Sequence, residues 1–228
     1  MARTDGAAAA AETSGDSPIQ RQPPEEHAHM SIGIIGAGAI GSAIAEILSR
    51  AGIDVTISNS RGPDTLADLA KRLGPHVHTG TREQAAGQDL VFVAVNWSQL
   101  PGAMAGLPDW NDRIVIDTNN SIEAPLFQPF ELHGRTSSEV FADMVPGARV
   151  VKAFSHLTPD LLTADPVARG GRRVLFLSGD DLEARQTVRA LIDRLGFFSL
   201  DLGPLAVGSR LLQFPGGPLP AHHLVKVG

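Results

Sequence analysis

The feature that most constrains the fold is a glycine-rich turn between an apolar run and an amphipathic segment. Three glycines form the pattern Gly36-x-Gly38-x-x-Gly41 directly after the apolar run Ser31–Ile35. The next segment repeats its apolar residues every three or four positions, as a helix that buries one face does. These residues are Ile40, Ala43, Ile44, Ile47, Leu48 and Ala51. A strand, a tight turn and a helix in this order predict the first βαβ unit of a parallel sheet.

Each glycine of the pattern has a separate predicted task. Gly36 permits the tight turn, Gly38 lets the backbone approach a pyrophosphate, and Gly41 lets the helix pack closely on the strand. The N-terminus of the helix presents free N–H groups and the positive end of its dipole to phosphates. A turn of purely structural glycines is the alternative. The strand and helix around the pattern favour a dinucleotide-binding loop instead.

The end of the second predicted strand, Val55–Ser58, indicates which dinucleotide binds. About 20 residues after the central glycine, an NAD-preferring site places Asp or Glu. Here the chain reads Ser58-Asn59-Ser60-Arg61-Gly62-Pro63 and has no acidic residue. A guanidinium fork with hydroxyl and amide groups suits a ribose 2′-phosphate. We therefore predict NADP(H) as the cofactor, with a solvated loop arginine as the alternative for Arg61.

The rest of the chain alternates short apolar runs with helical segments. This pattern predicts an α/β fold of Rossmann type, with a doubly wound, mostly parallel sheet in a single domain at residues 30–213. Residues 1–29 are expected to be a disordered leader and residues 214–228 a C-terminal tail. The Thr136-x-x-Glu139 spacing predicts a capped helix, and Asp180–Leu195 predicts a long amphipathic one. The further strands are expected at Val77–Thr79, Leu90–Val95, Ile114–Asp117, Val150–Phe154, Val174–Ser178 and Phe197–Leu202.

The fourth predicted strand ends where ligands of open α/β sheets bind. Val95, Asn96 and Trp97 stand at its carboxyl end, and Asn119 follows the next strand. Ligands of such folds lie in the crevice at the carboxyl edge of the sheet. We therefore expect these four residues to bind the cofactor, with Asn96 and Trp97 on the ribose or nicotinamide side. An equally ordinary interpretation makes Trp97 the start of a packed helix.

Composition excludes several other classes of protein. The chain has no cysteine, so thiolate nucleophiles and iron–sulfur clusters are excluded and redox chemistry requires a bound cofactor. A formal net charge of −6 with dispersed basic residues favours a small-molecule ligand over nucleic acid or a membrane surface. The sequence lacks a membrane-spanning apolar run, so a cytoplasmic location is expected. His76 and His78 share a predicted strand face, yet without a third ligand they predict no metal site.

Several segments together resemble the NADPH-dependent coenzyme F420 reductases. These are Ile32–Gly52, Asn59–Pro63, Val150–Phe154, Asp201–Leu205 and Ser209–Leu211. The resemblance extends from Met30 to about Gln213. The same fold group includes dinucleotide-binding enzymes and the reductase domain of membrane metalloreductases.

The resemblance implies hydride transfer between NADP(H) and a deazaflavin (coenzyme F420) or flavin-like ring. By position, Gly36, Ala37, Gly38, Ala39 and Ile40 would hold the pyrophosphate. Ser58, Asn59, Ser60 and Arg61 would hold the 2′-phosphate. Phe154, Ser155, His156 and Leu205 would shape the pocket for the second ring. Members without a second domain often complete that pocket by pairing, so a homodimer is expected.

Two departures from the family affect the acceptor side. Ser155-His156 stands where members commonly have Asn-Thr or His-Thr, and Phe214–Pro218 replaces a further apolar helix. A truncated or reshaped acceptor site is therefore expected. One alternative is a reductase of a carbonyl or imine, which needs a proton donor, and His156 is the best-placed candidate. A lone histidine after a strand is more often a packing residue, however. The other alternative is a non-catalytic NADP-binding or sensing module.

Overall fold

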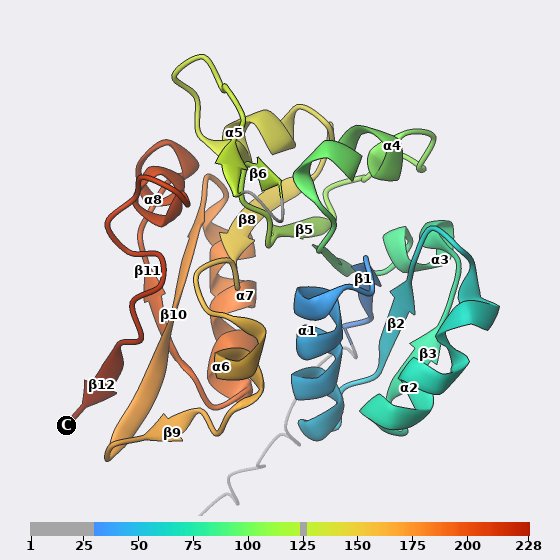
Figure 1. Ribbon diagram of the computed structural model, residues 1–228, viewed down its shortest axis with the longest axis horizontal. Helices are drawn as coiled ribbons and strands as arrows, with labels where there is room; N and C mark the ends of the chain where they lie inside the picture. The colour runs from blue at the N-terminus through green and yellow to red at the C-terminus, as the bar shows by residue number, and fades with distance from the viewer. Residues whose placement is uncertain (1–29, 124–126) are drawn as a thin grey trace, which may run out of the picture.

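A computed structural model describes residues 30–123 and 127–228, so the predicted leader at residues 1–29 lies outside the described residues. The described chain forms a ten-stranded mixed sheet and a separate two-stranded hairpin (Figure 1). The strands of the large sheet are β1 (Ile32–Ile35), β2 (Val55–Ser58), β3 (Val77–Thr79), β4 (Leu90–Val93), β5 (Ile114–Asp117), β8 (Arg149–Ala153), β9 (Val167–Ala168), β10 (Gly171–Gly179), β11 (Phe198–Asp201) and β12 (Val225–Val227). The hairpin pairs β6 (Ile122–Glu123) with β7 (Gln128–Pro129).

The order of the strands defines a doubly wound sheet. Along the main path they follow as β11-β10-β8-β5-β4-β1-β2-β3. The six strands from β3 to β8 are parallel, and β10 then reverses direction against β8. The six parallel strands have the order of the Rossmann fold, so the predicted fold class is confirmed. The chain turns to opposite sides of β1 when it forms β2 and β4, which makes the β1–β4 boundary the switch point.

Helices cover both faces of this sheet. They are α1 (Ala39–Arg50), α2 (Ala67–Leu73), α3 (Arg82–Ala86), α4 (Leu100–Met104), α5 (Ser137–Ala142), α6 (Pro159–Thr163), α7 (Leu182–Arg194) and α8 (Leu205–Leu212), with short 3₁₀ turns η1 (Pro63–Leu66) and η2 (Trp97–Gln99). The predicted capping box is present at α5, where Glu139 N donates to Thr136 Oγ1 over 3.3 Å. The predicted first and last long helices are present as α1 and α7.

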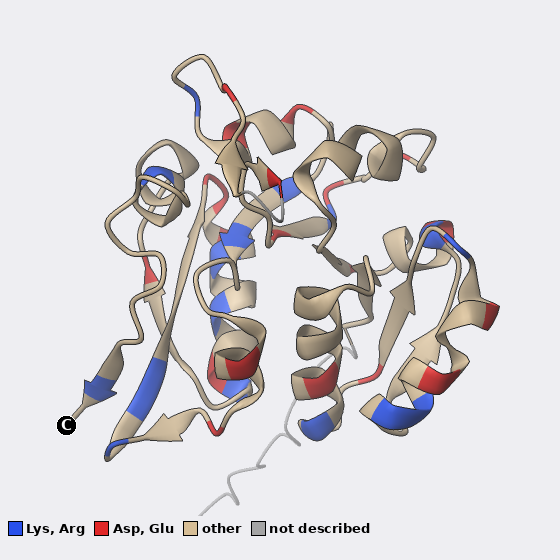
Figure 2. Cartoon of the chain, in the orientation of Figure 1, with Lys and Arg blue, Asp and Glu red and all other residues tan. Residues whose placement is uncertain are grey.

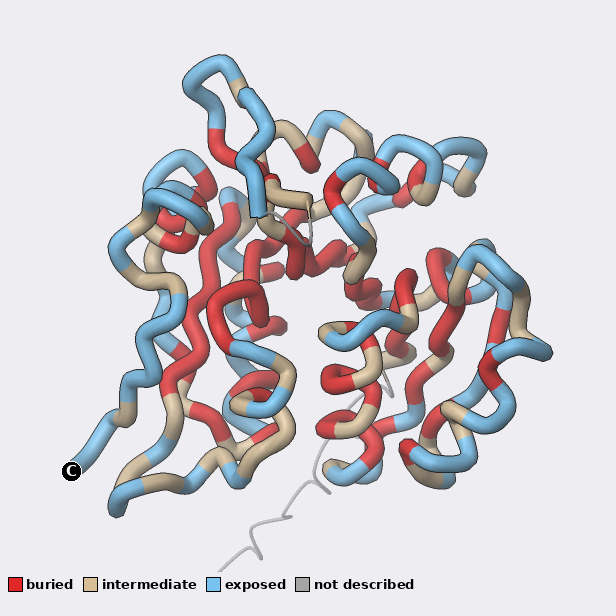
Figure 3. Tube along the Cα trace, in the orientation of Figure 1, coloured by how far each residue is buried: buried red, intermediate tan, exposed pale blue. Residues whose placement is uncertain are grey.

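Alternation along the strands divides the core into two layers. In β5, Ile114 and Ile116 join the layer under α1 and α7, whereas Val115 joins the layer under α3, α4 and α5. Successive side chains of a strand point to opposite faces, so each strand feeds both layers. Figure 3 shows the buried residues concentrated along these strands and the exposed ones on the outer helices and loops. Each fully buried large side chain stabilises the fold by about 1.5–3 kcal/mol.

Residues 214–228 contain a strand that the sequence did not predict. Strand β12 pairs antiparallel with the first residues of β10, and β9 pairs with the same end of β10. Strand β12 therefore lies beside the first residues of β10, which extend past the part of β10 that pairs with β8 and β11 (Figure 1). Figure 2 shows positive and negative residues interspersed over the molecule. Within residues 30–123 and 127–228, no helix is long and apolar enough to cross a membrane.

Candidate cofactor cleft

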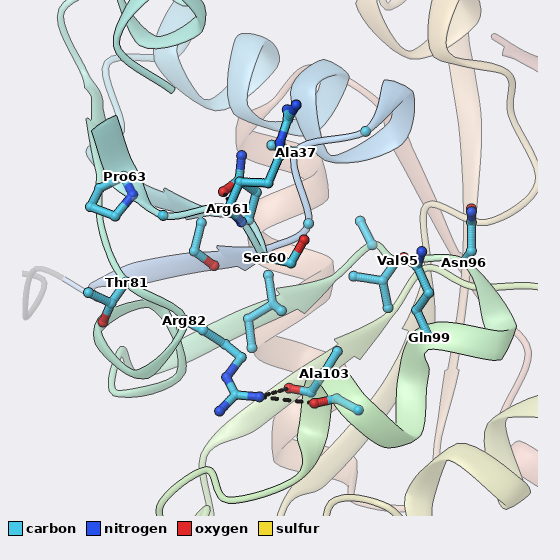
Figure 4. Close-up of a pocket in the computed structure, with 18 of the residues that line it drawn as sticks. Ala37, Ser60, Arg61, Pro63, Thr81, Arg82, Val95, Asn96, Gln99 and Ala103 are labelled. Atoms are coloured by element: carbon cyan, nitrogen blue, oxygen red, sulfur yellow. Dashed lines mark hydrogen bonds between the residues drawn. The ribbon is translucent and has the colours of Figure 1, made fainter. Parts of the chain in front are cut away.

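A cavity of about 890 Å³ opens at the carboxyl edge of the sheet, at the β1–β4 switch point. This size lies within the usual range for ligand pockets. The loops after β1, β2, β3 and β4 form its walls (Figure 4). Lining residues are Ile35, Gly36, Ala37, Gly38, Ser58, Asn59, Ser60, Arg61, Gly62, Pro63, Thr81, Arg82, Glu83, Ala94, Val95, Asn96, Ser98, Gln99, Gly102 and Ala103.

The three glycines of the first loop have different surroundings. Gly36 has a φ of 112°, and a Cβ there would overlap the carbonyl oxygen of Ala94. A Cβ on Gly41 would overlap the carbonyl oxygen of Gly36, so this glycine lets α1 approach β1. A Cβ on Gly38 would meet nothing within 4 Å. The space beside Gly38 is therefore open to a ligand that approaches the backbone closely.

The N-terminus of α1 is left without a side-chain cap. Gly38 is its N-cap residue, no side chain accepts a bond from the first turn, and that turn carries no acidic residue. By contrast, α3, α5 and α7 are capped by Thr81, Thr136 and Asp181. An uncapped helix start leaves N–H groups and a positive partial charge directed at the cleft. This combination suits a phosphate group.

The turn after β2 uses two of its four predicted ligands for its own structure. The Ser58 side chain is fully buried and its Oγ donates to Ile34 O over 3.1 Å. Asn59 Oδ1 accepts from Arg61 N at 2.9 Å, and Asn59 Nδ2 donates to Thr65 Oγ1 at 2.9 Å. These bonds shape the turn and leave the side chains of Ser60 and Arg61 exposed. Among the described residues, no acidic side chain forms an ion pair with Arg61.

A second wall of the cleft was missed by the sequence reasoning. Arg82 Nη1 donates to Gly102 O at 3.0 Å and to Ala103 O at 3.4 Å, which connects α3 to α4 (Figure 4). Arg82 Nη2 also donates to Glu83 Oε1 at 2.9 Å. The pKa of the Glu83 carboxyl lies below its usual value because its own backbone N–H and the Arg82 guanidinium hydrogen bond to it. Unlike Arg61, Arg82 is therefore occupied by partners within the protein.

Some of the residues at the ends of β4 and β5 line the cavity, and others support the residues that line it. Val95 and Asn96 line the cavity, whereas Asn119 lies behind them and its Oδ1 accepts from Val95 N at 3.2 Å. Trp97 is buried and packs 6.5 Å from Phe130 between ring centroids, at the start of η2. Trp97 therefore starts a packed helical turn, which was the alternative considered for it from the sequence. Ala39 and Ile40 begin α1 and do not line the cavity.

The four residues expected around the second ring do not line the cleft. Phe154, Ser155, His156 and Leu205 are all buried, and the Phe154 ring meets Phe92 edge to face at 5.3 Å. They lie beside β8 and β10, where the reversed strand closes that half of the sheet. The geometry thus places the expected acceptor residues in the packed interior.

His156 is held as a neutral packing residue. Its ring lies 4.7 Å from that of Phe176, and its Nε2 is 3.2 Å from Val174 O. Burial lowers the pKa of His156 to about 4, against the weaker opposing effect of the Val174 bond. A buried imidazole that is neutral at physiological pH and outside the cleft has neither the proton nor the access for the donor role considered from the sequence.

His76 and His78 share a single carboxylate partner. His76 Nδ1 lies 2.9 Å and His78 Nε2 3.4 Å from Asp54 Oδ1, on the exposed edge near β3. These hydrogen bonds lower the pKa of Asp54. In the described part of the chain, no group of three or more potential ligands is arranged to hold a metal ion.

Fold and cleft together define a Rossmann-type α/β protein with a ligand cleft at its switch point. Residues 31–121 match the family model described as NADP oxidoreductase, coenzyme F420-dependent. The hypothetical protein SMa0349 from Sinorhizobium meliloti has 44% identity and a TM-score of 0.82, with 86% of this chain and 96% of that chain covered. Residues 31–121 belong to this NADP oxidoreductase family, and the resemblance inferred from the motifs is confirmed.

Two further relatives are more distant. A crystal structure of a candidate F420-dependent NADP reductase from Arthrobacter sp. FB24 has 28% identity and a TM-score of 0.65, with 77% of this chain and 86% of that chain covered. Rat metalloreductase STEAP3 is 30% identical over 190 residues, which is 83% of this chain and 37% of the relative. The chain therefore spans just over a third of the length of that curated relative.

Proposed function

We propose that this protein binds NADP(H) in the cleft and transfers a hydride between NADPH and a deazaflavin or flavin-like acceptor. One observation carries the proposal. The uncapped N-terminus of α1 and the guanidinium of Arg61, which has no acidic partner among the described residues, open onto the same cavity. They provide two separate anion sites, one for a pyrophosphate and one for a ribose 2′-phosphate.

The lining residues fit a dinucleotide laid across the switch point. The backbone at Gly38 would hold the pyrophosphate, and Ser60 with Arg61 the 2′-phosphate. The adenine would lie between the β2 turn and the α3–α4 wall, and the nicotinamide would extend past Val95 and Asn96. Bound NADPH supplies the hydride, and the residues of this chain bind and orient it.

Hydride transfer to a flavin-like ring suits a cleft without an acid or base at its centre. The dihydronicotinamide is oxidised to NADP⁺, and the acceptor ring takes the hydride together with a proton from solvent. Both reactive atoms belong to the two ring systems, so alignment and exclusion of water are the main tasks of the protein. The homodimer expected from the sequence is part of this proposal, because a second copy would cover the open side of the cleft.

The alternative acceptors have less support. A carbonyl or imine requires a proton donor, and His156 is buried away from the cavity. Glu83 is the acidic residue among the lining side chains, and it is paired with Arg82. A non-catalytic binding module would use the cofactor cleft alone, and the observation in its favour is that the expected acceptor residues are buried away from that cleft.

The test is turnover of NADPH by the full chain under anaerobic conditions. NADPH is mixed with coenzyme F420, with FMN or FAD, and with a panel of ketones and imines, while the absorbance of the reduced nicotinamide is followed. We expect oxidation with the deazaflavin or a flavin. Turnover with ketones or imines alone would refute the proposed acceptor class. Tight NADPH binding without any turnover would refute catalysis and favour the binding module.

A further inference from the structure

A buried polar network lies at the carboxyl ends of β5 and β8, behind the cleft. Asp117 and Lys152 face each other across these parallel strands, and neither side chain is exposed to solvent. Lys152 Nζ is 3.4 Å from Asp117 Oδ2 and donates to Asn119 O at 2.7 Å. Charged side chains are almost never fully buried unless they are paired. The role of this buried pair therefore needs an explanation.

Every polar group of this pair has a partner within the protein. Ser138 Oγ donates to Asp117 Oδ2 at 2.6 Å, and the backbone N and Nδ2 of Asn119 donate to Asp117 Oδ1 at 2.9 and 3.0 Å. Ser137 Oγ lies 3.5 Å from Lys152 Nζ. A network satisfied in this way rigidifies the segments that it joins. Here it joins the loop after β5, strand β8 and the start of α5.

The network reaches the cleft through Asn119. The backbone N and the side-chain Nδ2 of Asn119 both donate to Asp117 Oδ1, and Lys152 Nζ donates to the backbone carbonyl oxygen of Asn119. The free oxygen of that amide then accepts from Val95 N at 3.2 Å. Val95 lines the cavity at the end of β4, on the side where the nicotinamide half of the cofactor would extend.

We propose that Lys152 is a positioning residue, which acts through Asn119 to hold the β4 end in the geometry that accepts the nicotinamide half of NADP(H). This inference rests on the proposed function, since it presupposes that NADP(H) occupies the cleft. Lys152 touches neither the cavity nor the cofactor path. Its role is indirect, and it assigns a task to the Val-Val-Lys-Ala-Phe segment that the acceptor pocket does not use.

Two probes separate this role from a general loss of folding. NADPH occupies both halves of the cleft, whereas adenosine 2′,5′-bisphosphate occupies only the half near Gly38 and Arg61. Binding of each probe is measured by calorimetry for the wild-type protein, Asn119→Ala, Lys152→Met and Lys152→Arg, with folding checked by circular dichroism. Asn119→Ala leaves the Lys152–Asp117 pair in place, so it remains informative if Lys152→Met does not fold.

We expect Asn119→Ala and Lys152→Met to weaken NADPH about tenfold, as loss of one supported contact predicts, and to leave the bisphosphate within about twofold of wild type. Lys152→Arg should restore part of the NADPH affinity because it keeps a buried donor. Ser178→Ala is the matched control. Ser178 pairs with Lys152 across β10 and β8, and its Oγ donates to Gly203 O at 2.9 Å, away from the cleft.

The outcomes distinguish the two levels of the proposal. Equal weakening of both probes, or no weakening of either, would overturn the positioning role and leave the proposed function standing. If Ser178→Ala weakened NADPH as strongly as Asn119→Ala, the effect would be a general one and the role would also be refuted. If the wild-type protein bound neither probe, the proposed function and the positioning role would both fall.

Discussion

The sheet has an open half, around β1, β2 and β4, and a closed half, around β8 and β10. The two halves differ at the edge where the parallel strands end. Around β1, β2 and β4, the edge carries an uncapped helix start, the exposed Arg61 and a cavity of about 890 Å³. Around β8 and β10, the corresponding positions hold Phe154, Ser155 and His156, all buried. Strand direction explains the contrast. The first half is wholly parallel, so its loops gather at one edge, whereas β10 runs back along β8 and closes the second half.

This contrast shows where the fold leaves polar groups for a ligand. The start of α1 has backbone donors without side-chain caps, while α7 in the other half is capped by Asp181 at 2.7 Å. Other helices, such as α6, also lack a side-chain cap, but the start of α1 opens onto the cavity, so its backbone donors are available to an external acceptor. The predictions below test whether the two halves respond as differently as their geometry indicates.

The largest expected effect is on the glycine turn of the open half. Gly36→Ala places a methyl group against Ala94 O at a φ of 112°, so the turn must move. We expect NADPH affinity to fall several hundredfold, about 3–4 kcal/mol, as measured by calorimetry. Gly203→Ala is the control in the closed half, with a φ of 79° but no atom within 4 Å of the new Cβ. Gly203→Ala should cost about 1 kcal/mol of stability and leave NADPH affinity unchanged. If both substitutions weakened NADPH binding equally, the proposed difference between the two halves would be refuted.

In the closed half, His156 should control stability rather than turnover. Its folded-state pKa of about 4 lies below the ordinary value of 6.5, so the unfolded chain binds the proton first. Stability is therefore present above about pH 6.5 and is lost as the pH falls toward 4, by about 3 kcal/mol at 1.36 kcal/mol per unit. His156→Phe should flatten this part of the pH profile in urea unfolding and retain the neutral-pH rate of NADPH oxidation.

The exposed His222 provides the control for that experiment. His222→Phe should keep the wild-type dependence of stability on pH. A large fall in the oxidation rate of His156→Phe, with the fold intact, would contradict the packing role and return His156 to the list of candidate proton donors.

In the open half, Arg61 should decide between the two nicotinamide cofactors. Arg61→Ala is expected to weaken NADPH by about 1.5–3 kcal/mol, because a charge-assisted bond to the 2′-phosphate is lost, and to leave NADH unchanged. Dissociation constants for both nucleotides measure this difference. Arg194→Ala, an exposed arginine at the end of α7, is the control and should affect neither. An equal loss for NADPH and NADH would refute the 2′-phosphate assignment.

Local signals predicted the open half better than the closed one. The glycine turn, the strands around it and Arg61 are encoded in short contiguous segments, whose periodicity and residue types are visible in the sequence. The wall from Ser98 to Ala103 was not predicted because α4 has only five residues and contains Pro101 and Gly102, which are poor helix signals. The Thr81-x-x-Gln84 spacing is a capping-box signal for the neighbouring wall.

The closed half depends on contacts that no local pattern reveals. The strand ends after β8 resemble ligand positions in sequence, but the antiparallel return of β10 buries them. Strand β12 lies in a segment rich in Pro and Gly, and it forms because the first residues of β10 offer it an edge for pairing. Similarly, the sequence does not reveal that Ser58, which lines the cavity, donates its hydroxyl proton to Ile34 O of the neighbouring strand.

The smallest expected difference concerns the caps of two helices, one in each half. Thr81→Ala removes the capping box of α3, where Gln84 N donates to Thr81 Oγ1 at 3.2 Å, and Asp181→Ala removes the bond from Ala184 N at the start of α7. Each substitution should cost about 1 kcal/mol in urea unfolding. Because Thr81 lines the cleft beside Arg82, Thr81→Ala should also weaken NADPH by about twofold to fivefold, whereas Asp181→Ala should not. If both substitutions changed stability and neither changed NADPH affinity, the α3 wall would not contribute to binding. The cofactor contacts of the open half would then be limited to the glycine turn and Arg61.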